Sequence, residues 1–152
     1  MPFSAQEREG VYRAIYQRRD IRAYRPQPLE PDLLLRLLDA AHHAGSVGYM
    51  QPWNFIWVAD ADLRRQVYQH FCQVNTQAAT HYVNDRQTHY RALKLQAILD
   101  APHNLLVTCD TRRGGPHVLG RATTPQTDVY STCLAVQNLW LAARAEGVGW
   151  AG

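Results

Sequence analysis

The residues best suited to chemistry in this chain are Arg18, Arg19, Asp20 and Arg22, which directly follow the first predicted helix. Arginine presents a planar set of N–H donors that fits phosphate groups, and it stays charged at any working pH. Three arginines favour the ionised form of a neighbouring carboxylate unless burial opposes it. This arginine cluster indicates either a site for a phosphate-bearing anion with an acid or base beside it, or a solvated helix end whose charges satisfy carbonyls.

Composition narrows the class of protein. The chain has 152 residues, of which 46% are hydrophobic and 19% charged, so we assign residues 1–152 to a single globular domain. No run of about 18 apolar residues predicts a membrane-spanning helix. The net charge of +3 comes almost entirely from arginine, since Lys94 is the only lysine. The dense basic stripe of a nucleic-acid-binding protein is missing.

The cysteines and the N-terminus predict a cytoplasmic location. Cys72, Cys109 and Cys133 are odd in number and widely spaced, which is typical of reduced thiols. They show neither a pairing pattern nor the spacing of a metal site. Residues 1–7 lack the charged region and the following apolar run of a signal peptide.

The first predicted helix leads into the arginine cluster. Ser4 and Glu7, three residues later, form a capping box, and the helix is expected to run to about Arg18. Pro26 and Pro28 then predict an extended link.

A second helix is predicted to start at Pro31, whose missing N–H needs no partner in the first turn. We expect it to stop at Gly45 in the left-handed conformation. His42 and His43 point in different directions near this end, so we expect them to cap or pack and not to share a metal. The predicted buried face consists of Leu34, Leu35, Leu37, Leu38 and Ala41.

Residues 46–55 predict a loop that faces a ligand. The loop contains Ser46, Gly48 and a rigid Gln51–Pro52 step. Backbone N–H groups and a hydroxyl in such a loop suit a planar polar ligand. The apolar run 56–59 that follows indicates a short strand.

The middle of the chain is predicted to be helical. Residues 62–85 carry apolar side chains at helical spacing, and a fourth helix is expected through Leu93, Leu95 and Ile98. The polar and aromatic segment 81–85 between them belongs either to a mobile lid or to a surface helix.

A second strand, a glycine-rich loop and a long helix complete the chain. The run 104–109 is continuously apolar, so we expect a central strand. The loop 110–121 lacks the Gly-Lys-Ser/Thr ending of a P-loop, and no GxGxxG fingerprint follows a strand. The last helix is expected from about Thr124 to Glu146, ending at Gly147. Its small residues permit close packing at the centre of the fold or in a dimer seam.

Taken in order, these segments resemble the nitroreductase superfamily. They resemble in particular its 5,6-dimethylbenzimidazole synthase branch, whose members destroy flavin to make the lower ligand of vitamin B12. Nearly the whole chain takes part in this resemblance. The matching segments are residues 18–22, 46–55, 108–110, 114–115, 119–121 and 128–147.

The resemblance implies a fold, a reaction and partners. The fold would be α+β, with a central mixed sheet flanked by helices, in a homodimer that holds FMN near the subunit interface. Reduced FMN would be the substrate, and O2 would help to fragment its ring system into dimethylbenzimidazole and erythrose 4-phosphate. NAD(P)H would act only indirectly, through a flavin reductase that supplies the reduced FMN.

The resemblance also implies roles for single residues. Asp20 would be catalytic, because ordinary nitroreductases tend to carry a serine there and a carboxylate within reach of the flavin can move protons. The residues implied to bind FMN are Arg18, Arg19, Arg22, Ser46, Gly48, Met50, Gln51, Leu119 and Gly120.

The family pattern continues past Gly152, through a Gly-Trp-Val-Ser-type segment whose serine acts with the aspartate, then a strand and a C-terminal extension. We therefore expect the C-terminal part of the family fold to be absent from this chain. Two alternative functions remain. One is an NAD(P)H-dependent, nitroreductase-like oxidoreductase that conserves its FMN, and the other is a flavin-binding or partner-binding fragment without turnover.

Overall fold

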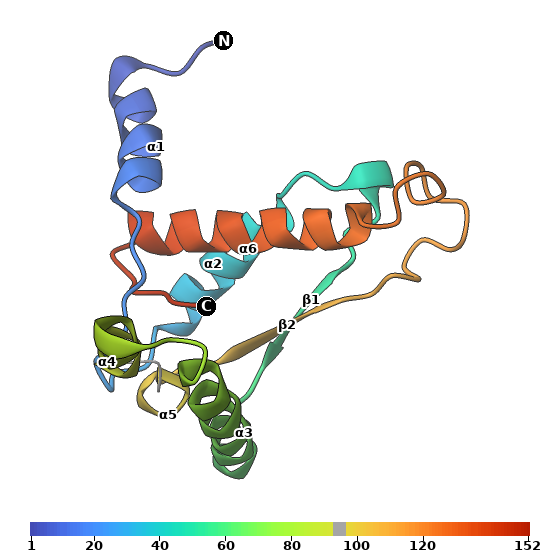
Figure 1. The fold of residues 1–152 in the computed structure, drawn as a ribbon. Coiled ribbons are helices and arrows are strands. Elements are labelled where there is room, and N and C mark those ends of the chain that lie inside the picture. The colour runs from blue at the N-terminus through green and yellow to red at the C-terminus, as the bar shows by residue number, and fades with distance from the viewer. Residues whose placement is uncertain (93–96) are drawn as a thin grey trace.

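The computed structural model describes residues 1–92 and 97–152, and helix α6 (Thr127–Ala145) lies at its centre. Figure 1 shows α6 crossing the molecule, with α2 (Pro31–His42) packed beside it. Small side chains on α6 allow this close approach, as the sequence predicts. The buried core where the two helices meet consists of Leu37, Ala41, Leu139 and Ala143.

Strands β1 (Trp53–Trp57) and β2 (Leu105–Cys109) form an antiparallel pair in which Trp53 lies opposite Cys109. The α+β class is therefore confirmed. Within the described residues this sheet has two strands, in place of the mixed sheet that the resemblance implies, because the remaining periodic segments are helical. Strand β2 is not a buried central strand, since the side chain of Leu106 is 52% exposed.

Helix α1 (Ala5–Gln17) begins at the predicted capping box. The backbone N–H of Ser4 donates to the Glu7 carboxylate at 2.7 Å, and the backbone N–H of Glu7 donates to the Ser4 hydroxyl at 3.3 Å. No residue of α1 is buried. In Figure 1 the helix projects from the body of the molecule, and it contacts α6 near its own C-terminal end.

Helix α2 begins at Pro31 as predicted, but its end and its outer face differ from expectation. The residue after the helix is His43, with a φ of −82°, and Gly45 is not in the left-handed conformation, so that prediction is wrong. Leu35 is 63% exposed because it lies on the side of α2 that faces away from α6.

His42, the last residue of α2, packs edge-on against Trp53 and accepts a hydrogen bond from the indole N–H of Trp53, in line with the predicted packing role.

The helix predicted over residues 62–85 ends earlier than expected, and a second helix starts after a turn. Helix α3 (Ala61–Ala79) ends before a turn, and α4 (Asn84–Ala92) starts at a residue with a φ of +54°. Such a φ breaks helical continuity. Segment 81–85 thus spans the turn and the start of α4. Leu93 and Leu95 lie outside the described residues, and Ile98 lies in the short helix α5 (Ala97–Asp100).

Helix α6 stops at Gly147 as predicted. Gly147 has a φ of +75°, and the N–H of Val148 donates to the carbonyl of Ala143 at 2.8 Å. These contacts form a Schellman motif, which satisfies carbonyls at the helix end. None of the described helices is long and apolar enough to cross a membrane.

Candidate functional site

The carboxylate of Asp20 lies between two guanidinium groups of the arginine cluster. Arg22 Nη2 is 2.8 Å from Asp20 Oδ2, and Arg18 Nη1 is 3.4 Å from Asp20 Oδ1. Each of the three side chains is about one-third exposed, so donors remain available to an anionic ligand. Arg19 differs, because its guanidinium donates to the carbonyls of Tyr16 and Arg18. Arg19 therefore satisfies the helix end, as the alternative interpretation of the sequence expects.

The arginine cluster is anchored to α6 and to the segment that follows it. The Arg18 guanidinium lies over the indole of Trp140, 4.0 Å from the ring centroid. The N–H of Ile21 donates to the carbonyl of Trp150 at 3.0 Å. A Cβ on Gly149 would lie 2.9 Å from the Ile21 side chain, so this position requires glycine for close packing.

One tyrosine beside the cluster has a perturbed pKa. Burial raises the pKa of Tyr24 above its ordinary value, and the negative charge of Asp20 raises it further, while Arg22 opposes the shift. The neutral phenol is therefore the favoured form in the folded protein.

The other implied FMN-binding residues lie on two loops that touch each other, loop A (residues 46–51) and loop B (residues 110–121). Loop A contains the short helix η1 (Val47–Tyr49). A Cβ on Gly48 would lie 2.5 Å from the Val118 side chain, and one on Gly120 would lie 2.6 Å from the Val47 side chain. The absence of side chains at both glycines therefore allows the two loops to meet.

Hydrogen bonds fix the conformation of loop A. The hydroxyl of Ser46 accepts from the N–H of Gln51 at 2.8 Å, and the hydroxyl of Ser131 on α6 accepts from the N–H of Val47 at 3.2 Å. Among the implied binding residues, Leu119 is 80% exposed, whereas Met50 is buried and its sulfur faces Arg121. Met50 therefore packs inside the protein and supports loop A, while the Leu119 side chain is accessible to a ligand.

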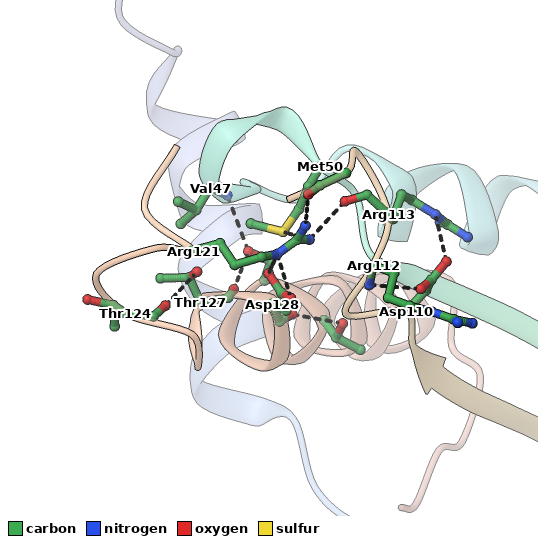
Figure 2. Close-up of polar contacts among 12 residues, drawn as sticks. Val47, Met50, Asp110, Arg112, Arg113, Arg121, Thr124, Thr127 and Asp128 are labelled. Carbon is green, nitrogen blue, oxygen red and sulfur yellow. Dashed lines mark hydrogen bonds and ion pairs between the residues drawn. The ribbon is translucent and has the colours of Figure 1, made fainter. Parts of the chain in front are cut away.

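Figure 2 shows three residues that the sequence analysis did not identify, Arg113, Arg121 and Asp128. Arg121 Nε donates to the Asp128 carboxylate at 3.0 Å. Arg113 donates to the carbonyls of Gln51 and Trp53 at 2.6 and 2.9 Å. The available signal was the presence of arginines in a glycine-rich loop, and it gave no indication of these partners.

The structure does not bring the arginine cluster and the two loops together at one point of this chain. Arg18 contacts α6 at Trp140, whereas loop A contacts it at Ser131 and loop B at Asp128. Nine residues separate Ser131 from Trp140, which corresponds to about 14 Å along a helix axis. The described residues contain no group of three or more His, Cys, Asp or Glu side chains placed to hold a metal ion.

Comparison with known proteins decides the family. Residues 15–151 match the model of the Nitroreductase family. The chain belongs to the nitroreductase family.

Curated relatives of this nitroreductase-family chain carry the name 5,6-dimethylbenzimidazole synthase. The chain is 40% identical to the protein from Rhodospirillum rubrum over 150 residues, which cover 97% of the chain and 71% of the relative. It is 37% identical to a protein from Rhodobacter capsulatus over 149 residues, which cover 98% of the chain and 72% of that relative.

Solved structures show the same fold at lower identity. Iodotyrosine deiodinase bound to FMN and 3-iodo-L-tyrosine is 22% identical, with a TM-score of 0.72 over 91% of this chain and 71% of the other. A BluB-like flavoprotein from Clostridium difficile 630 is 19% identical, with a TM-score of 0.66 over 97% of this chain and 73% of the other. The nitroreductase-like fold is therefore confirmed.

Proposed function

We propose that this chain acts as a 5,6-dimethylbenzimidazole synthase. The reaction uses O2 to fragment reduced FMN into dimethylbenzimidazole, the lower ligand of vitamin B12, and erythrose 4-phosphate. The observation that carries the proposal is the carboxylate of Asp20 held between Arg18 and Arg22. This arrangement occurs in a chain that is 40% identical to the synthase of Rhodospirillum rubrum.

The arginine cluster fits the charge of FMN. Arg18 and Arg22 each use one nitrogen for Asp20 and remain about one-third exposed, so further N–H donors are free for phosphate oxygens or for the polar edge of the ring. Charge-assisted, bidentate contacts of this kind are the strongest that arginine makes. Arg19 contributes positive charge, while its guanidinium stays on the helix end.

Loops A and B fit the planar part of FMN. Gly48 and Gly120 place backbone close to backbone, and the exposed side chain of Leu119 offers an apolar contact beside them. Bound reduced FMN would supply both the electrons that O2 requires and the carbon atoms of the product. Asp20 would take up or release a proton at the ring, which is the step that a serine at this position performs poorly.

We place the site between two copies of the chain. The two regions that would contact FMN lie at different points along α6, and exposed apolar residues lie beside the loops. Large exposed apolar side chains that lie close together are typical of a subunit interface. They are Leu119, Val129, Tyr130 and Leu134.

The proposed reaction also implies a supplier of reduced FMN. A flavin reductase that uses NAD(P)H would provide it, since the chain would consume one FMN in each turnover. Such a partner and the three free thiols fit a cytoplasmic enzyme.

The decisive experiment mixes the purified chain with chemically reduced FMN in air and analyses the products by mass spectrometry. We expect dimethylbenzimidazole and a stoichiometric loss of FMN. Samples without protein, without O2 and with oxidised FMN serve as controls. If FMN is conserved and no benzimidazole forms, the proposal is wrong for this chain.

A second candidate is an FMN-dependent oxidoreductase that conserves its flavin. It is favoured by 28% identity over 145 residues to a putative NADH dehydrogenase/NAD(P)H nitroreductase from Methanothermobacter thermautotrophicus. This function predicts continuous NAD(P)H oxidation with a nitroaromatic acceptor and no loss of FMN. The same samples therefore distinguish the two functions.

A further inference from the structure

Arg121 contacts four residues around loops A and B. Its side chain is only 12% exposed. Nη1 donates to the carbonyl of Gly115 at 2.5 Å, and Nη2 donates to the carbonyl of Arg113 at 2.8 Å and to the sulfur of Met50 at 3.3 Å. Nε donates to Asp128 at the start of α6. One guanidinium thus joins both loops to the central helix.

The buried carboxylate of Asp128 requires a positively charged side chain at position 121. Its side chain is 1% exposed, and among the described residues Arg121 is the partner of its carboxylate. A buried carboxylate is costly unless a positive charge and hydrogen bonds compensate it. Its position in the first turn of α6 also places it at the positive end of the helix dipole. Asp128 therefore fixes the Arg121 guanidinium against the first turn of α6.

Arg113 extends the connection from loop B to loop A. Its carbonyl accepts from Arg121, and its guanidinium donates to the carbonyls of Gln51 and Trp53 and to the side-chain oxygen of Asn54 at 2.5 Å. The order of contacts is therefore Asp128, Arg121, Arg113 and Gln51. This chain of contacts leads from the rigid helix to the backbone of the loop that would face the ligand.

Loop A needs such support because its backbone is strained. Tyr49 has a φ of +52° and Gln51 a φ of +44°. These residues have a Cβ, and the left-handed region is unfavourable for them unless their surroundings impose it. Gln51 is held on both sides, by the Ser46 hydroxyl at its N–H and by Arg113 at its carbonyl.

From these contacts we infer that Arg121, Arg113 and Asp128 are positioning residues of the proposed flavin site. They hold the backbone of loops A and B in the conformation that receives FMN, and they act through the loops without touching the ligand. This inference rests on the proposed function for the identity of the ligand. The loop conformation itself can be tested without any ligand.

The test uses Arg121→Lys, with Arg112→Lys as the matched control. Lysine keeps a positive charge beside Asp128, but a single ammonium group cannot replace a planar guanidinium that donates to four residues. Arg112 lies in the same loop, its side chain is exposed, and its backbone N–H makes the local contact to Asp110. We expect the FMN dissociation constant to rise about tenfold in Arg121→Lys, as the loss of one or two buried hydrogen bonds implies. Arg112→Lys should bind as the unmodified chain does.

Hydrogen exchange of the ligand-free chain supplies the second readout. Arg121→Lys should speed exchange in residues 46–51 and 113–120 and leave α2 unchanged. Arg113→Lys, which is less buried and keeps the Asp128 pair intact, should speed exchange in residues 46–51 alone. Unchanged exchange in both loops would overturn the inference, and so would a uniform increase that includes α2, because that would indicate a general role in stability.

The two readouts separate this inference from the proposed function. If the unmodified chain binds no FMN, the proposed function fails. In that case the exchange measurement still decides whether these residues hold the loops. If the unmodified chain binds FMN and Arg121→Lys binds it equally well, the positioning role is wrong and the proposed function stands.

Discussion

The guanidinium of Arg18 lies over the indole of Trp140, 4.0 Å from the ring centroid, while its Nη1 pairs with Asp20 at 3.4 Å. The aromatic ring belongs to α6, and the carboxylate belongs to the extended segment after α1. Trp140 thus orients the implied catalytic carboxylate through the arginine between them. A cation–π contact at a partly exposed site contributes about 0.5–1 kcal/mol.

Replacing Trp140 by leucine should therefore slow product formation. Leucine preserves an apolar contact with α6 but removes the ring face on which Arg18 rests. We expect the rate of benzimidazole formation to fall about two- to fivefold, as a loss of about 0.5–1 kcal/mol implies. The matched control is Trp57→Leu, which removes an exposed indole on β1. Equal rates in both variants would contradict the role of Trp140.

Asp20→Asn should separate binding from chemistry. Asparagine has nearly the same shape but does not act as a proton acceptor at neutral pH. We expect FMN binding, measured by equilibrium fluorescence titration, to be retained while benzimidazole formation is lost. Asp39→Asn, which changes an exposed carboxylate on α2, provides the control for the loss of one negative charge. Product formation by Asp20→Asn at the original rate would exclude a catalytic role for Asp20.

Gly48→Ala should destabilise the protein, because two effects act in the same direction. The added Cβ would lie 2.5 Å from the Val118 side chain and 3.0 Å from the carbonyl oxygen of Leu119, at a φ of +60°. We expect the free energy of unfolding to fall by about 1–3 kcal/mol.

The control for this variant is Gly10→Ala. Gly10 lies within α1, and a Cβ there would meet no atom within 4 Å. Alanine should stabilise that helix by up to about 1 kcal/mol. Urea unfolding of both variants measures the two effects, and a Gly48→Ala protein as stable as the unmodified chain would show that loops A and B do not meet as described.

Because of Tyr24, the stability of the protein should decrease as the pH rises in the alkaline range. Burial raises the pKa of Tyr24 in the folded protein above the value near 10 of an exposed tyrosine. The neutral phenol therefore contributes stability that is fully present below the unfolded pKa and is lost as the pH rises through the folded pKa. Between about pH 8 and pH 11, the urea midpoint of unfolding should fall further for the unmodified chain than for Tyr24→Phe. A parallel fall in both proteins would show that Tyr24 is equally ionisable in both states.

Local signals predicted much of the fold. The capping box at Ser4, the proline at the start of α2 and the glycine after α6 act within one turn of the chain, so the sequence is sufficient to locate these helix ends. The exposure of Leu35 was not predictable in the same way. Several leucines follow one another on α2, and the direction from which α6 crosses decides which of them is buried.

The site shows the same division. Arg18, Asp20 and Arg22 are neighbours in sequence, so their mutual contacts could be expected from the sequence alone. Arg113 and Arg121 contact loop A residues that lie 62 and 71 positions away. Such contacts depend on how β1 and β2 bring the two loops together. They cannot be predicted from the residue types alone.

Helix α6 contacts loop A at Ser131 and the arginine cluster at Trp140, so it sets the relative orientation of the two regions. A single-residue insertion between these contacts would rotate one region relative to the other by about 100° and move it by about 1.5 Å. Substitutions in the same stretch would leave that geometry intact. We therefore expect homologues to differ in sequence between these two positions but to keep the same number of residues there.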